Sequence, residues 1–279
     1  MDLHSRYPGL ADLQARARRR MPHFVWEYLE SATGVEHGAA RNRAALDAVL
    51  FRPAALRGSV GPEVSCQFLS QEYPVPFGIA PVGMSGLIWP RAEAHLARHG
   101  GQARVPYCLS TVASVVPEDV GAATEGLGWF QLYAPKDPEI RADMLRRAWD
   151  TGFRTLVLTV DLPAASRRER LVRSGLTQPP RLTPRLLAQA ARRPAWALGM
   201  KAHGMPRMRF IESFANRVPT KGLSSTAHLG YMMRAAPDWD YVAALRDLWH
   251  GHLILKGVCE PDVAARAKSA GVDAVWVST

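Results

Sequence analysis

Six short runs of apolar residues, most of them ending in polar residues, recur along this chain. The runs cover residues 77–81, 106–110, 129–133, 155–161, 253–256 and 274–278. A parallel strand that is buried on both faces reads as a continuous apolar run. The sequence therefore predicts six parallel strands. Helical segments between several of them predict βα units with right-handed crossovers.

Helices are predicted before the first run and between the later ones. Apolar residues at helical spacing from Leu13 to Tyr28 predict a helix over residues 11–31, which Pro22 divides in two. A further helix is expected at 36–48, followed by irregular or hairpin structure at 51–72. The remaining expected helices are residues 92–99, 117–124, 137–151, 184–191, 240–248 and 260–270.

This alternation is typical of a (β/α)₈ barrel, whose functional groups lie where the parallel strands end. The expected fold class is therefore α/β, a TIM barrel with about six of eight strands present. An N-terminal helical segment precedes it, and a long insertion follows the fourth strand. The polar residues at the ends of the runs are expected to converge on one site: Ser110, Gln131, Tyr133, Thr159, Asp161, Lys256 and Ser278.

Composition fits one large domain over residues 1–279. The hydrophobic fraction is 47%, which is ordinary for a protein with a sizeable core. The three cysteines lack metal-ligand spacing and indicate reduced thiols in a cytoplasmic compartment. No run reaches the ~18 apolar residues of a transmembrane helix, and the N-terminus lacks the apolar core of a signal peptide.

The net charge of +10 arises in one segment. Residues 164–217 contain twelve Lys and Arg residues but only Glu169 and Glu212 as acids, and the rest of the chain is balanced. This basic part of the insertion at 164–250 fits an anionic membrane surface, a nucleic acid or plain solvent. No nucleic-acid recognition motif accompanies it, so a nucleic-acid partner is not expected.

Short motifs along the whole chain have an order and spacing in common with one enzyme family. They are Met21-Pro22 through Tyr28, Phe51-Arg52-Pro53, Ala80-Pro81-Val82-Gly83, Leu109-Ser110-Thr111, residues 129–133, Thr159-Val160-Asp161, residues 167–170 and Leu255-Lys256-Gly257. Together they resemble the FMN-dependent α-hydroxy acid dehydrogenases and oxidases. Residues 86–90 and 203–206 resemble the branch that includes lactate and mandelate dehydrogenases.

The resemblance implies FMN as cofactor. It places the backbone of Pro81, Val82 and Gly83 beside the reactive flavin nitrogen, with Gly83 allowing close approach. It implies that Lys256 lies near the flavin N1–O2 edge, where a fixed cation stabilises the reduced ring. The ring edge would be hydrogen-bonded by polar strand-end residues, and the cofactor set is completed by Ser110, Gln131, Thr159 and Ser278.

The resemblance also implies a substrate site for a small 2-hydroxy acid. Tyr28 and Tyr133 would present phenol hydroxyls to the substrate, and Arg168 would bind its carboxylate. Asp161 would orient a catalytic histidine and raise its pKa. Tyr133, Asp161 and Lys256 are the expected catalytic residues, and no metal ligands are expected.

Because this sequence departs from the family pattern, two functional hypotheses are open. The catalytic histidine is expected just after Ser278, but the sequence stops at Thr279, before the arginine of the same motif and the last two strands. The first hypothesis is FMN-dependent oxidation of a lactate- or mandelate-type L-2-hydroxy acid to the 2-keto acid. Electrons would pass to a membrane quinone or similar acceptor. The alternative is an inactive, C-terminally truncated fragment that retains only membrane or partner binding.

Two further expectations concern location and relatives. By resemblance to mandelate dehydrogenase, residues 164–217 would attach the protein peripherally to the cytoplasmic side of the inner membrane. A homo-oligomer is left open. Another FMN barrel, related to isopentenyl-diphosphate isomerase, fits Tyr28 and Arg168 less well.

Overall fold

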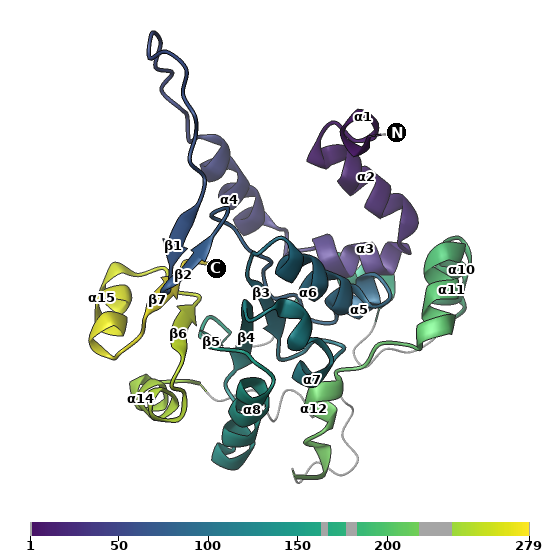
Figure 1. The fold of residues 1–279 in the computed structure, drawn as a ribbon. Helices are drawn as coiled ribbons and strands as arrows, with labels where there is room; N and C mark the ends of the chain where they lie inside the picture. The colour runs from purple at the N-terminus through teal and green to yellow at the C-terminus, as the bar shows by residue number, and fades with distance from the viewer. Residues whose placement is uncertain (1, 163–166, 177–182, 218–235, 279) are drawn as a thin grey trace. The chain divides into compact units, whose positions relative to one another are not determined.

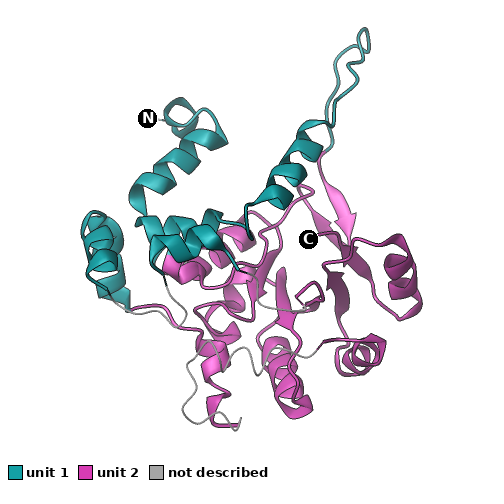
Figure 2. Cartoon of the chain, turned by 180° about the vertical axis from the view of Figure 1, so that it is seen from behind, with its two compact units in different colours: residues 1–63, 88–90, 166–204 teal, residues 64–87, 91–165, 205–279 magenta. Residues whose placement is uncertain are grey.

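A computed structural model describes residues 2–162, 167–176, 183–217 and 236–278 (Figure 1). The chain divides into two compact units (Figure 2). Unit 1 comprises residues 1–63, 88–90 and 166–204, and unit 2 comprises residues 64–87, 91–165 and 205–279. The single domain expected over residues 1–279 stays a prediction.

Unit 1 is helical. Its helices are α1 (Leu3–Arg6), α2 (Leu10–Arg20), α3 (His23–Glu30), α4 (His37–Asp47), α9 (Glu169–Ser174), α10 (Pro184–Ala191) and α11 (Pro194–His203). The break between α2 and α3 falls at Met21 and Pro22, as the sequence predicts, because proline cannot donate to the preceding turn. None of the helices described is long and apolar enough to cross a bilayer.

Segments far apart in sequence hold unit 1 together. The rings of Phe24 on α3 and Trp196 on α11 pack edge to face, 5.7 Å apart. Arg170 on α9 pairs with Glu27 at 2.8 Å and with Glu36 at 2.9 Å. The Arg170 hydrogen bond lowers the pKa of Glu36. The beginning of the chain and the insertion therefore share one small core.

Unit 2 contains both sheets. The first is an antiparallel hairpin of β1 (Cys66–Phe68) and β2 (Gln71–Tyr73). The second is parallel, with strands in chain order: β3 (Tyr107–Ser110), β4 (Gly128–Tyr133), β5 (Thr155–Thr159), β6 (His252–Lys256) and β7 (Ala274–Trp276). The α-helices of this unit are α5 (Ser85–Ile88, ending at the unit boundary), α6 (Ala92–Gln102), α7 (Pro117–Val120), α8 (Pro138–Asp150), α12 (Arg209–Glu212), α14 (Trp239–Leu248) and α15 (Pro261–Ser269). Two 3₁₀ turns lie at Ala122–Thr124 and Ala215–Arg217.

Five of the six predicted strands form, and the first does not. Within residues 77–81 only Ile79 pairs, in an isolated parallel bridge with Tyr107. Ile79 donates to the Pro106 carbonyl at 2.8 Å and accepts from Cys108 at 2.9 Å. Pro76 and Pro81 bracket this segment and have no N–H to extend the ladder, so the pairing stops after one residue.

The two faces of the parallel sheet carry different side chains because successive residues point to opposite sides. The outer face contains Leu109, Phe130, Leu158 and Leu255, which pack with residues of α6, α8, α14 and α15. The inner face carries a smaller apolar cluster of Cys108, Val157 and Ile254, flanked by Trp129 and Trp276. Residues two positions further along these strands therefore share the inner face.

The insertion between β5 and β6 is more helical than the sequence predicts. The helices expected at 184–191 and 240–248 are confirmed as α10 and α14, but α9, α11 and α12 were not foreseen. The α12 helix returns to unit 2, where Phe210 packs edge to face on Phe130 at 5.7 Å. The parts of the insertion at 164–166, 177–182 and 218–235 lie outside the described residues.

Replacing Phe130 tests the outer core. Phe130 is 0% exposed, whereas Phe51 is 94% exposed. We expect Phe130→Ala to lower the free energy of unfolding by about 3–5 kcal/mol, because it leaves a cavity. The matched change Phe51→Ala should shift it by no more than about 0.5 kcal/mol. Urea unfolding measures both, and equal losses would contradict this packing.

Candidate functional site

The carboxyl ends of the parallel strands bring the predicted site residues of unit 2 together. Backbone register pairs Ser110 with Gln131, and Thr159 with both Tyr133 and Lys256. Ser110, Gln131, Thr159 and Lys256 each lie two residues beyond a member of the inner apolar face, so their side chains point to the same side. The sheet therefore brings these four strand-end residues together, and their shared function stays a prediction.

Gln131 is the centre of a buried hydrogen-bond chain. Its Oε1 accepts from the Ser110 hydroxyl at 3.0 Å and from the Thr111 amide at 3.3 Å. Its Nε2 donates to Thr159 Oγ1 at 2.9 Å. These hydrogen bonds fix the orientation of the Gln131 side chain, and the residue is buried, with 1% of its surface exposed. Within the described part of the chain, the second Nε2 proton and the Thr159 hydroxyl proton have no acceptor.

A second cluster lies at the ends of β5, β6 and β7. Lys256 Nζ donates to Ser278 Oγ at 3.0 Å and lies 4.0 Å from Asp161 Oδ2. Ser278 Oγ lies 3.5 Å from the same carboxylate oxygen. The ammonium, hydroxyl and carboxylate form one partly buried polar group. A cation is therefore held next to the Gln131 chain.

Tyr133 joins the two clusters. It ends β4 beside Thr159, and its backbone amide donates to Thr111 Oγ1 at 3.1 Å. Burial, and to a lesser degree the negative charge of Asp161, raises the pKa of the Tyr133 phenol. Since the ordinary value is already about 10, the phenol is a neutral hydrogen-bond donor at physiological pH.

Pro81, Val82 and Gly83 follow the Ile79 bridge, in the loop before α5. The loop is tied to the segment after β3, since the Met84 amide donates to the Val112 carbonyl at 2.9 Å. The Val82 side chain is exposed. These residues therefore belong to the same end of unit 2 as the strand-end groups.

Tyr28 and Arg168 belong to unit 1 and contact each other there. The Arg168 guanidinium lies over the Tyr28 ring, 5.1 Å from its centroid. It also donates to the Tyr28 carbonyl at 2.7 Å and to the Ser31 carbonyl at 3.3 Å. Two of its donor directions are thus used to hold the end of α3. The expected carboxylate-binding role of Arg168 stays a prediction.

Gly257 is a site residue that the strand pattern did not single out. It has φ of +100°, which side chains rarely adopt, and a Cβ atom here would overlap the Asp161 side chain. Lys256 and Asp161 can be neighbours only because the residue after Lys256 is glycine. The sequence shows this glycine in the motif Leu255-Lys256-Gly257, but it does not show that Gly257 packs against Asp161.

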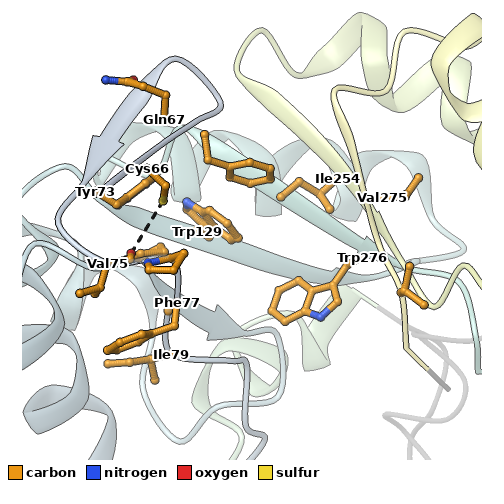
Figure 3. A pocket seen from close by; sticks show the side chains of 15 residues that line it. Cys66, Gln67, Tyr73, Val75, Phe77, Ile79, Trp129, Ile254, Val275 and Trp276 are labelled. Atoms are coloured by element: carbon orange, nitrogen blue, oxygen red, sulfur yellow. Dashed lines mark hydrogen bonds between the residues drawn. The ribbon is translucent and has the colours of Figure 1, made fainter. Parts of the chain in front are cut away.

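A cavity of about 500 Å³ on the inner side of unit 2 was also missed (Figure 3). It is mostly apolar, and Trp129, Trp276 and Ile254 line it from three different strands. The Trp129 ring lies between Phe68 at 6.0 Å and Trp276 at 6.3 Å. Trp129 and Ile254 precede Gln131 and Lys256 by two residues. The cavity therefore lies toward the amino ends of the strands, away from the polar cluster.

Comparison with known proteins identifies the class. A family model for the FMN-dependent dehydrogenases matches residues 17–279. The L-lactate dehydrogenase of Caulobacter vibrioides is 34% identical over 272 residues, which are 96% of this chain and 70% of that protein. The (S)-mandelate dehydrogenase of Pseudomonas putida is 30% identical over 271 residues, 97% of this chain and 68% of that protein.

Comparison with solved structures points to the same family. A monotopic membrane protein, (S)-mandelate dehydrogenase, superposes with a TM-score of 0.87 at 30% identity, over 96% of this chain and 71% of that one. A mandelate oxidase gives 0.75 at 28% identity, over 96% of this chain and 68% of that one. This chain is an α/β flavoprotein of the TIM-barrel type. It belongs to the FMN-dependent dehydrogenase family, whose cofactor is FMN.

The residues described fit that cofactor. An isoalloxazine ring has a polar edge that needs donors and acceptors, and the Gln131 chain offers unused donors on a buried surface. Lys256 supplies a fixed positive charge beside them. Both features lie at the strand ends, where this architecture places its sites.

Gly257→Ala tests the Lys256–Asp161 arrangement. We expect it to lower the free energy of unfolding by about 3 kcal/mol, from left-handed backbone strain plus overlap with Asp161. The control is Gly271→Ala, where φ is +76° but the nearest atom to a Cβ is 3.5 Å away. That variant should lose only about 1–2 kcal/mol. Equal losses in urea unfolding would show that Asp161 does not crowd Gly257.

Proposed function

We propose that this chain carries the flavin-binding part of the active site of an FMN-dependent enzyme. That enzyme would oxidise a small L-2-hydroxy acid of the lactate or mandelate type to the 2-keto acid. The observation that carries the proposal is the buried chain Ser110–Gln131–Thr159 with Lys256 beside it. The relatives named for lactate and mandelate support the substrate class.

When bound, FMN supplies the two-electron acceptor for this oxidation. The side chains of this protein would do the rest. Ser110, Gln131 and Thr159 would hold the ring edge in a fixed position, which removes the cost of reorganising donors during the reaction. Lys256 would compensate negative charge that develops at that edge.

Tyr133 and Asp161 would act on the substrate side. The raised pKa of Tyr133 keeps its proton in place, so the phenol can donate to an anionic substrate without becoming charged. The carboxylate of Asp161 would orient the group that removes the substrate proton. Tyr28 and Arg168 are proposed to contribute a hydroxyl and a positive charge for the carboxylate.

A second candidate function is membrane or partner binding without turnover. Within the described residues Asp161 contacts Lys256 and Ser278, and no histidine contacts it. A chain with this arrangement alone would lack the proton acceptor. Anaerobic addition of L-lactate or (S)-mandelate to FMN-loaded protein separates the two functions. Bleaching of the flavin supports oxidation, whereas a stable yellow protein supports binding alone.

Thr159→Val tests the cofactor site directly. We expect it to weaken FMN binding about 3- to 10-fold, because one hydrogen bond contributes about 0.5–1.5 kcal/mol. Thr155→Val is the matched control: it makes the same change at the other end of β5, on the same face. Quenching of FMN fluorescence measures both. If both variants bind as tightly as the wild type, FMN does not lie at the strand ends.

We further propose that α10 and α11 attach the protein to an anionic membrane surface and that a membrane quinone or similar carrier accepts the electrons. Leu187 is 55% exposed and Leu198 is 65% exposed. Arg192 and Lys201 are exposed on the same pair of helices. Exposed leucines among basic residues suit a negatively charged lipid interface. The monotopic membrane relative supports this attachment.

Vesicle flotation tests the attachment. We expect binding to phosphatidylserine-containing vesicles, weaker binding in high salt and little binding to phosphatidylcholine alone, because screening removes the attraction. Leu187→Glu with Leu198→Glu should abolish it. Leu46→Glu, on α4 at 71% exposure, is the control and should leave binding intact. Salt-independent binding, or no binding by the wild type, would refute the proposal.

A further inference from the structure

Glu93 is a buried carboxylate that the site described above does not use. It lies in the first turn of α6 and is 1% exposed. No lysine or arginine pairs with it among the described residues. An ionised carboxyl in such a place is costly unless hydrogen bonds compensate it. Its position at a helix N-terminus supplies part of that compensation.

One oxygen of Glu93 joins α5 to the loop after β3. Oε1 accepts from the Gly86 amide at 3.0 Å, and from both the amide and the hydroxyl of Ser114 at 3.0 and 2.6 Å. Gly86 lies three residues after Gly83. Ser114 lies four residues after Ser110. The carboxylate is therefore a bridge between α5, which directly follows the loop of Val82 and Gly83, and the loop after β3.

Beside this bridge, Gly86 of α5 packs directly against the Ser114 side chain. A Cβ atom on Gly86 would overlap Ser114 Oγ and would lie 3.2 Å from Glu93 Oε2. Glu93 Oε2 itself is buried and has no hydrogen-bond partner within the described residues. All the hydrogen bonds of the bridge therefore go to the other oxygen, Oε1.

The bridge continues into the buried polar chain. The Val112 amide donates to the Ser110 hydroxyl at 3.3 Å, and the Thr111 amide donates to the Gln131 carbonyl at 3.0 Å. Hydrogen bonds run from Gly86 through Glu93 to Ser114, and the backbone of residues 110–114 connects Ser114 to the residues that bond Gln131. Moving Glu93 would change the separation between the Val82–Gly83 backbone and the Gln131 side chain.

We propose that Glu93 is a positioning residue for the flavin ring, because its carboxylate sets the separation between the Val82–Gly83 backbone and the Ser110–Gln131–Thr159 chain. The proposal rests on the proposed FMN site. A planar ring that contacts a backbone segment and a row of side chains would bind well only if the distance between those two parts is fixed. Small displacements of either part would weaken binding.

The test combines FMN affinity with amide exchange in the absence of FMN. We expect Glu93→Ala to weaken FMN binding about 10- to 100-fold, since hydrogen bonds to a charged group are lost both at α5 and at the loop after β3. Exchange of the Gly86 and Ser114 amides should become faster in the same variant. Glu93→Gln keeps one acceptor oxygen of the same size and should recover most of the affinity.

A second variant guards against a simple loss of stability. Gly86→Ala leaves the carboxylate in place but forces α5 away from the loop after β3, so it should also weaken FMN binding about tenfold or more. Asp137→Ala is the control. The Asp137 carboxylate also accepts two amide bonds at a helix N-terminus, at 2.8 and 3.3 Å, but it caps α8. It should lower stability and leave FMN affinity unchanged.

The outcomes separate this proposal from the proposed function. If the wild type binds FMN and Glu93→Ala and Gly86→Ala bind it equally well, the positioning role is wrong and the cofactor site stands. If the wild type binds no FMN, the proposed function fails. In that case amide exchange still tests the bridge. If the Gly86 and Ser114 amides exchange at the same rate in Glu93→Ala as in the wild type, the bridge is wrong, and if they exchange faster, the bridge is supported.

Discussion

Backbone pairing between parallel strands is the constraint on which the rest of this structure depends. Register alone places Ser110 beside Gln131 and Thr159 beside Lys256. Because side chains alternate between the faces, the same register puts Phe130 and Leu158 into the outer core. A slip of one residue would exchange the two sets, so the apolar core and the polar site specify each other.

Burying these polar groups costs less because they partly satisfy one another. Gln131 uses both ends of its amide within the strand ends, which avoids the penalty of an unpaired buried group. Glycines make the close approaches possible, at Gly257 beside Asp161 and at Gly86 beside Ser114. At Gly86 this contact fixes the distance between α5 and the loop after β3, because the two cannot separate without breaking their hydrogen bonds to Glu93.

Much of this could be predicted from the sequence, because apolar runs and strand-end polar residues are local signals. The strands at 155–159 and 252–256 and the meeting of Gln131 with Thr159 follow from them. The failure at residues 77–81 reflects proline chemistry that overrides an apolar run. The α11 helix escaped notice because its apolar residues follow no clear stripe, and Trp196 packs on a partner 172 positions away from it, Phe24.

Glu93 illustrates the kind of site residue that sequence patterns do not reveal. In the sequence it is one acid in the first turn of an amphipathic helix, where a solvated carboxylate is the ordinary outcome. Its importance arises from Gly86 and Ser114, which are 7 residues before it and 21 residues after it. Gly86 lies in α5 and Ser114 in the loop after β3, so the periodicity of α6 does not relate either of them to Glu93. Only the folded arrangement of α5 and the loop after β3 turns that acid into a bridge, so residues that set distances are found from contacts and not from periodicity.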